Sequence, residues 1–213
     1  MPTPPITPTI PTPSVTGGAP AAAAGSRTGT SRFDAVWAGR SPAASADSVW
    51  VPAVSATLVL VVGVISIATR QPWLSAGLGP TALLIASNPG SSTTRFHSIV
   101  VGHLVAFLCA WFALLLLGVG DAAALTGSGS RSVPVVRIWA SAIAVAITAL
   151  VQPSLRAYHP PAAATALLVT LGFYKLTWKT SLSMLAGVVV VALLGEWFRR
   201  IRLKERSARS TKA

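Results

Sequence analysis

Long apolar stretches separated by short polar ones dominate the chain after residue 48. Residues 49–69, 98–120 and 133–151 are each long and apolar enough to cross about 30 Å of hydrocarbon as a helix. Residues 180–195 begin a fourth stretch of this kind. His103 is the polar interruption of the second stretch, and Arg137 in the third lies where its side chain can reach the headgroups. The pattern predicts an all-α, polytopic membrane helix bundle with four long spans.

Two further apolar stretches are interrupted by proline and glycine. Residues 71–94 carry no charge, but their helical part, residues 81–87, is too short to cross a membrane alone. The second stretch follows Gln152 and Pro153 and continues as a short apolar helix to about residue 173. Interruptions of this kind are typical of half-helices or re-entrant loops. We therefore expect six segments, of which two are proline-broken half-helices.

The second interruption has the features of a helix N-terminus. Pro160 and Pro161 fix φ near the helical value and remove N–H groups that would have no helical partner. Ala162 and Ala163 then begin a segment of good helix propensity. Inside a membrane the free N–H groups of residues 162–164 would need a partner, and a helix N-terminus carries about half a positive charge. This break is therefore predicted to bind an anion.

The two interrupted stretches share a short repeat. A shift of 84 positions places residues 81–85, TALLI, on residues 165–169, TALLV. Each copy follows a long span and a break and precedes another long span. Interrupted segments in corresponding positions of two repeats are the best sequence indicator of a transporter's binding site. We expect the site where Pro80 and Thr81 approach residues 161–165.

The number of membrane crossings depends on the path of the half-helices. If both re-enter, the chain crosses four times and the repeats are parallel; if both cross, it crosses six times and the repeats are inverted. Arg131 and Arg137 balance Arg95 and Arg156, so the loop charges do not decide between these topologies. Both topologies place the two termini on the same side. The short apolar cores of the half-helices favour four full crossings.

Four polar side chains are candidates for the function. His159 could donate hydrogen bonds or titrate at an anion site, because imidazole titrates near neutral pH and an ionisable group at membrane depth indicates function. Alternatively, its ring caps carbonyls that the prolines leave free. His103 could be a second group of the pathway or only bond two helices together. Thr81 and Thr165 could complete the coordination of an anion or bond to their own helices.

Three polar side chains at the ends of the spans have simpler interpretations. Arg95 and His97 border the second span; Arg95 could attract anions at an entrance, but a solvated interfacial cation is the favoured interpretation. Glu196 lies near the end of the last span and is expected to pair with Arg199 or Arg200, about one helical turn further on.

Three blocks of the sequence resemble the HPP family of small integral membrane proteins. They are YHPPAAATALLVTLG at residues 158–172, GPTALL at residues 79–84 and VVGHL at residues 100–104. The resemblance covers residues 50–198, and its specific part is the His-Pro-Pro block. Many members carry Pro-Arg before the Gly-His block, where this chain has Phe96 and His97. The resemblance implies a multi-helix transporter; plant relatives are associated with nitrite movement into chloroplasts.

The two tails differ in composition from the apolar region. Residues 1–48 are rich in Pro, Thr, Ala, Ser and Gly and are expected to be disordered. This tail weakly resembles an organelle transit peptide, but the favoured interpretation is the cytoplasmic tail of a bacterial protein. The favoured interpretation predicts a bacterial inner membrane. The alternative location is a chloroplast envelope. Residues 199–213 form a basic tail that is expected to lie in the cytoplasm, and binding of anionic lipid is a secondary interpretation.

Composition argues against several other functions. The 213-residue chain is 52% hydrophobic with a net charge of +12, but its basic residues lie mostly in tails and loops, which argues against nucleic-acid binding. The sequence has no carboxylate pair, metal-ligand spacing or phosphate loop, so we expect no enzymatic activity, cofactor or metal. The sequence predicts a transporter or channel for a small inorganic anion, and a bundle this small is expected to form a homo-oligomer. The alternative is a non-transporting membrane scaffold.

Overall fold

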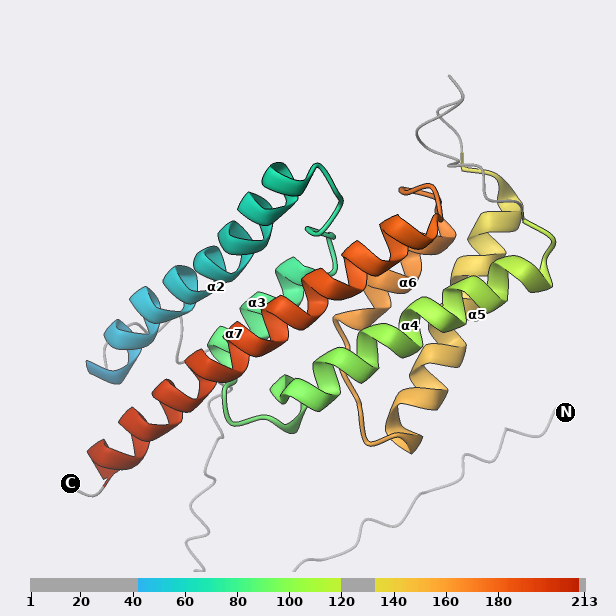
Figure 1. Ribbon diagram of the computed structural model, residues 1–213. Helices are drawn as coiled ribbons and strands as arrows, with labels where there is room; N and C mark the ends of the chain where they lie inside the picture. The colour runs from blue at the N-terminus through green and yellow to red at the C-terminus, as the bar shows by residue number, and fades with distance from the viewer. Residues whose placement is uncertain (1–41, 120–132, 211–213) are drawn as a thin grey trace, which may run out of the picture. The chain divides into compact units, whose positions relative to one another are not determined.

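The computed structural model describes residues 42–119 and 133–210, and these ranges contain six α-helices, a short 310 helix and no strand (Figure 1). This confirms the all-α prediction with four long and two short helices. The elements are α2 (Pro42–Thr69), α3 (Leu78–Ser87), η1 (Ser92–Thr94), α4 (Phe96–Leu116), α5 (Val135–Ser154), α6 (Ala162–Thr170) and α7 (Trp178–Ser210).

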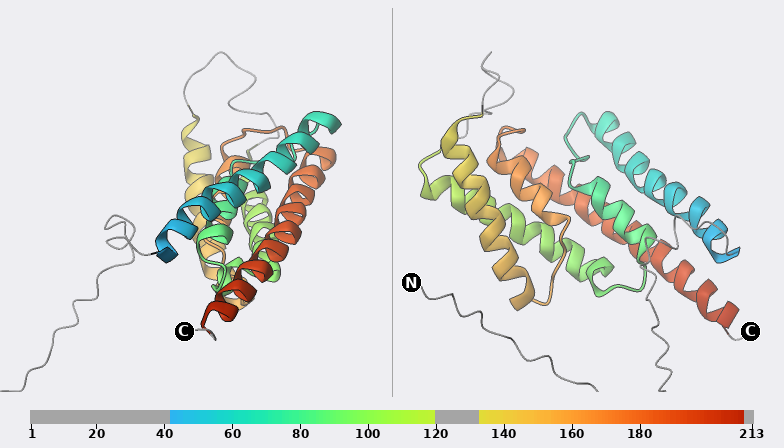
Figure 2. Two further views of the ribbon diagram at one scale, coloured as in Figure 1. Left: turned by 90° about the vertical axis from the view of Figure 1, so that its left-hand side faces the viewer. Right: turned by 180° about the vertical axis from the view of Figure 1, so that it is seen from behind.

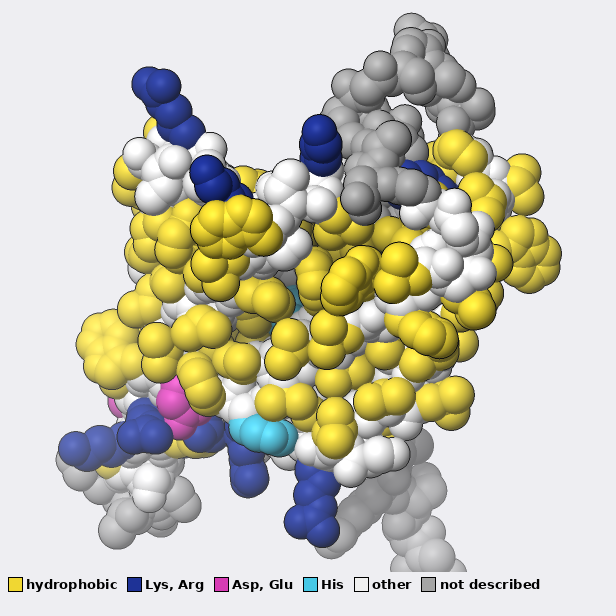
Figure 3. Space-filling model, turned by 45° about the vertical axis from the view of Figure 1, so that its right-hand side comes forward, with side chains coloured by type: hydrophobic (Ala, Val, Ile, Leu, Met, Phe, Trp, Pro, Cys, Tyr) yellow, Lys and Arg dark blue, Asp and Glu magenta, His cyan; other side chains and the backbone are white. Residues whose placement is uncertain are grey.

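Four helices are long and apolar enough to cross a membrane. The candidate spans are Ser48–Thr69, Phe96–Leu116, Val135–Ser154 and Trp178–Ala208. Hydrophobic side chains cover much of the surface between the two ends of the bundle, where Lys and Arg side chains project (Figure 3). This distribution fits a bilayer around the middle of the bundle, with the basic groups at the headgroup level.

The first interrupted stretch passes from one end of the bundle to the other. Leu74 packs beside Gly63 toward the end of α2, whereas the Ala82 carbonyl accepts a 3.5 Å hydrogen bond from Ser55, nearer the start of α2. α3 therefore runs antiparallel to α2 and ends near the end of the bundle at which α2 begins (Figures 1 and 2).

The second interrupted stretch also joins opposite ends of the bundle. It leaves the end of α5, where the Ala157 N–H donates to the Gln152 carbonyl at 3.0 Å. It finishes at Thr170, beside the start of α5. There the Thr170 carbonyl accepts a hydrogen bond of 2.9 Å from Arg137 Nη1. The Thr170 hydroxyl lies 2.7 Å from the Ser141 hydroxyl.

In both interrupted stretches the chain runs from one end of the bundle to the other, as the six-crossing alternative predicts, and the number of membrane crossings stays a prediction. The chain direction alternates through six segments, so α2 and α4 run one way and α5 and α7 the other (Figure 2). The two halves thus have the directions expected of an inverted repeat, although the repeat itself stays a prediction.

Two predicted boundaries also differ from the structure. α2 begins at Pro42 rather than at residue 49, since proline is well accommodated in the first turn of a helix. α7 continues to Ser210 through the predicted basic tail, because Arg, Lys and Glu are good helix formers. The predicted disorder of residues 1–41 and the predicted loop at residues 121–132 lie outside the described residues.

Two apolar clusters hold the bundle together. One joins α2, α3, α7 and the start of α4 and includes Leu58, Ile85 and Val191. The other joins α4, α5 and α6 and is rich in alanine, including Ala110 and Ala140. Small residues let helices approach closely in a membrane, where association depends on packing rather than on the hydrophobic effect. The half-helices belong to different clusters, and hydrogen bonds between buried polar side chains connect α3 to α6 through α4.

Candidate functional site

Four buried polar side chains from different segments meet inside the bundle. α3 contributes Thr81, α4 contributes His103, the α5–α6 connection contributes His159, and α6 contributes Thr165. Their exposed fractions are 0%, 0%, 0% and 3%, in that order. We call this group the central cluster. All four were predicted site residues, and the structure brings them into direct contact.

A continuous series of hydrogen bonds connects the central cluster. The Thr165 hydroxyl lies 2.7 Å from His103 Nδ1, and His103 Nε2 lies 3.0 Å from the Thr81 hydroxyl. The same hydroxyl lies 3.0 Å from His159 Nε2, and His159 Nδ1 lies 2.8 Å from the Thr93 carbonyl. The two imidazole rings are 5.2 Å apart between centroids. Every ring nitrogen of the pair therefore has a hydrogen-bond partner.

Three residues outside the predicted set of site residues position this cluster. A Cβ atom at Gly77 would lie 2.7 Å from the Thr165 hydroxyl, and one at Gly102 would lie 2.8 Å from the Cβ of His159. Gln152 donates to the Gly102 carbonyl at 3.1 Å and accepts the His159 N–H at 3.0 Å. The sequence did contain a signal for Gln152, because a Gln-Pro pair stands at the start of both interrupted stretches, at residues 71–72 and 152–153.

The helix N-terminus at the second break is not open. The N–H groups of Ala162, Ala163 and Ala164 donate to the carbonyls of the residues three positions earlier, at 3.0, 3.1 and 3.1 Å. The expectation that these groups lack partners is therefore wrong, because the first turn closes with the tighter 310 pattern. The side chain of Pro160 is exposed and that of Pro161 is half-buried. The hydrogen-bond donors that the site could offer to an anion are consequently side chains.

The first break contributes less than predicted. Pro80 lies on the exposed side of α3, outside the central cluster. The N–H of Leu78 is satisfied by the Ser75 carbonyl at 3.0 Å. Of the two predicted residues here, the structure places only Thr81 in the cluster.

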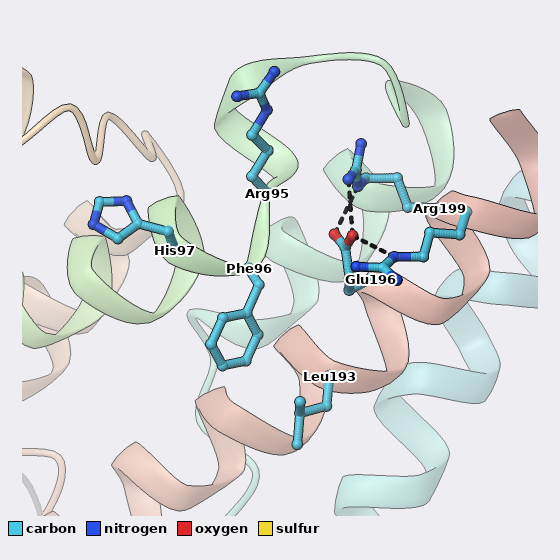
Figure 4. A pocket seen from close by; sticks show the side chains of 7 residues that line it. Arg95, Phe96, His97, Leu193, Glu196 and Arg199 are labelled. Carbon is cyan, nitrogen blue, oxygen red and sulfur yellow. Dashed lines mark hydrogen bonds and ion pairs between the residues drawn. The ribbon is translucent and has the colours of Figure 1, made fainter.

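A separate groove of about 450 Å³ lies between the start of α4 and the latter part of α7 (Figure 4). Glu196 pairs there with Arg199 at 2.7 Å and with Arg200 at 2.8 Å, as predicted. Arg95 and His97 also line the groove, and both are exposed. Among residues 42–119 and 133–210, no group of three or more His, Cys, Asp or Glu side chains could hold a metal ion.

A sequence model of the HPP transmembrane region matches residues 40–208 of the chain. The matched range includes all four spans and both interrupted stretches. Comparison with curated proteins gives no match, and comparison with solved structures gives none either.

Proposed function

The chain belongs to the HPP transmembrane family, and from this premise we propose that it is a transporter or channel for a small inorganic anion. A multi-pass membrane protein of this family is consistent with a role in transport. Nitrite is the first candidate substrate, because the resemblance to the plant members suggests it. Two halves that run in opposite directions and helices interrupted at corresponding positions are features of many secondary transporters, and both features support the proposal.

The observation that carries the proposal is the central cluster itself. Two imidazoles and two hydroxyls are buried together in a bundle whose other interior contacts are mainly apolar. Ionisable residues at membrane depth are costly and mark pathways for ions or substrates. Hydroxyl and imidazole N–H groups are also suitable donors for a small oxyanion.

The proposed mechanism assigns the half-helices a positioning role. Their first N–H groups are occupied by carbonyls, so the donors for the anion are the side chains of Thr81, Thr165, His103 and His159. α3 and α6 both begin near the middle of the bundle and run toward opposite ends, which directs two positive helix-dipole ends toward the cluster (Figure 1). The anion would replace the hydrogen bonds that the four side chains now make with one another.

The test is anion flux into proteoliposomes, with nitrite, nitrate, chloride and formate compared across pH. We expect His159→Ala to reduce nitrite flux to the level of empty liposomes while the protein remains folded. His97→Ala is the matched control, because His97 is exposed at the start of α4. Flux in His159→Ala equal to that of the unaltered protein would reject the proposed site.

A second candidate, a non-transporting scaffold, is favoured by one observation. The imidazole nitrogens and hydroxyls of the central cluster all have partners, so the cluster also acts as a polar contact between segments. A scaffold predicts no flux for any anion and tolerance of small polar residues at Thr81 and Thr165. The same flux panel distinguishes the two candidates.

We infer the type of membrane from the composition of the N-terminal tail and the orientation from the basic residues. We infer a bacterial inner membrane, with the basic end of α7 on the cytoplasmic side according to the positive-inside rule. A chloroplast envelope is the alternative. A bundle with so few spans would enclose a pathway more readily as a homo-oligomer, which cross-linking in native membranes would test.

A further inference from the structure

The partners of His159 fix the position of its proton in the neutral state. Its Nδ1 lies 2.8 Å from the Thr93 carbonyl oxygen, which can only accept, so Nδ1 carries the proton. In a neutral imidazole the other nitrogen is then a bare acceptor. His159 Nε2 must therefore receive the hydroxyl proton of Thr81 across 3.0 Å.

The same reasoning determines the tautomer of His103. A hydroxyl has one proton, so once Thr81 donates to His159, it can only accept from His103. His103 Nε2 therefore carries the proton in this 3.0 Å contact. Its Nδ1 becomes the acceptor for the Thr165 hydroxyl at 2.7 Å. The two neutral histidines thus hold opposite tautomers, and all the hydrogen bonds run in one direction from Thr165 to Thr93.

Thr81 has a further acceptor that would allow this series to take up a proton. Its hydroxyl also lies 3.0 Å from the Gly77 carbonyl oxygen. When a proton adds to the lone pair of His159 Nε2, the Thr81 hydroxyl can turn its own proton to Gly77. It then accepts N–H donors from both imidazoles. No covalent bond other than the new N–H forms, and every polar atom keeps a partner.

We propose that the central cluster is a proton-binding site whose proton is taken up at His159 Nε2 and accompanies the transported anion. This inference rests on the proposed function and specifies its coupling. The substrate class becomes a monovalent anion together with one proton, which is the electroneutral equivalent of a weak acid.

The surroundings of the rings explain why proton and anion would be coupled. The side chains that face the cluster are the hydroxyl of Thr81 from α3, the amide of Gln152 from α5 and the hydroxyl of Thr165 from α6. α4 contributes His103 itself, and the segment before α4 contributes the Thr93 carbonyl. Among the described residues, the titratable neighbour of each ring is the other imidazole, 5.2 Å away between centroids. Among residues 42–119 and 133–210, no carboxylate is hydrogen-bonded to the central cluster, so an anion is the natural counter-charge for the proton. Each ligand therefore strengthens binding of the other.

The first experiment measures nitrite uptake and luminal pH together in proteoliposomes whose membrane potential is set with potassium and valinomycin. We expect protein-dependent nitrite entry to acidify the lumen and to be insensitive to the potential. Nitrite entry that follows the potential without a pH change would overturn the coupling and leave anion transport standing. Absence of flux for every anion would reject transport and the coupling together.

The role of the Thr81 hydroxyl has its own test. We expect Thr81→Ser to retain coupled uptake and Thr81→Val, which has a similar shape without the hydroxyl, to lose proton movement. Unaltered coupling in a folded Thr81→Val protein would overturn the hydroxyl's role. A second test uses the unaltered protein, so its result does not depend on whether the Thr81→Val variant folds. Imidazole ¹⁵N chemical shifts should show opposite tautomers for His103 and His159 at alkaline pH, and two identical tautomers would contradict the proposal.

Discussion

The two halves of the bundle follow one plan but differ in what lies at its centre. Each half has a long helix, a break outside any helix, a half-helix and a second long helix. The first long helix ends in the same way in both halves, at an arginine with φ of 52°, Arg70 after α2 and Arg156 after α5. In both cases the following N–H bonds back to the carbonyl five positions earlier, which closes the helix end.

The second long helices show the difference. The shift that superimposes Thr81 on Thr165 places Gly187 of α7 at the position of His103 in α4. His103 bonds to Thr165 of α6, the half-helix that follows the second break, whereas Gly187 packs directly against the Trp73 carbonyl of the first break. The first break is thus held by close backbone packing and the second by side-chain hydrogen bonds. Of these two corresponding contacts, the one between His103 and Thr165 is therefore polar, whereas the one between Gly187 and Trp73 is made by close packing.

The largest effect is expected from Gly187→Ala. Its Cβ would overlap the Trp73 carbonyl, and backbone cannot move aside as a flexible side chain can. Overpacking costs about 1–3 kcal/mol and occasionally more, and we expect the upper end here. Denaturant unfolding in detergent micelles measures the loss. Gly79→Ala is the control, because nothing lies within 4 Å of its Cβ position, and equal stability of the two variants would contradict the close packing.

An intermediate effect is expected from Gly102→Ala. Its Cβ would lie 2.8 Å from the Cβ of His159 and 3.2 Å from the Ala157 carbonyl oxygen, so His159 must move. We expect a loss of about 1–2 kcal/mol in stability but a much larger loss of nitrite flux, since the hydrogen-bond geometry of the cluster is disturbed.

The matched control for this variant is Gly63→Ala, whose Cβ would meet only the Leu74 side chain at an ordinary 3.6 Å. Stability and flux should both remain near those of the unaltered protein. A Gly102→Ala variant that transports nitrite normally would show that the position of His159 is not critical, and the polar contact would then resemble the first break in being structural.

The smallest effect is expected at the two helix ends. Both arginines are exposed and adopt a left-handed backbone conformation that costs non-glycine residues about 1–2 kcal/mol. Arg70→Gly and Arg156→Gly should each relieve this strain, offset in part by the greater freedom of glycine in the unfolded chain. We expect a net gain of up to about 1 kcal/mol in both, measured by unfolding in micelles. A loss of stability in either variant would show that its arginine contributes an interaction beyond the turn.

The sequence determined the helical class, the four long spans and the identity of the polar candidates. Apolar length alone places α2, α4, α5 and α7, because a membrane-spanning helix must satisfy its own backbone. The TALLI and TALLV copies with the His-Pro-Pro block selected Thr81, Thr165 and His159, since polar residues are rare in such segments.

Only the tertiary structure decided how these residues meet and in which direction the broken segments run. The hydrogen bonds between Thr81 and the two histidines, His103 and His159, join residues far apart in the chain. Helical periodicity carries no information on such contacts. The partners of the N–H groups after Pro161 depend on how tightly the first turn of α6 closes, which favourable helix propensity does not specify. The close approach at Gly77 and Gly102 likewise depends on the packing of whole helices, because a missing side chain shows its purpose only when the neighbour that fills its space is known.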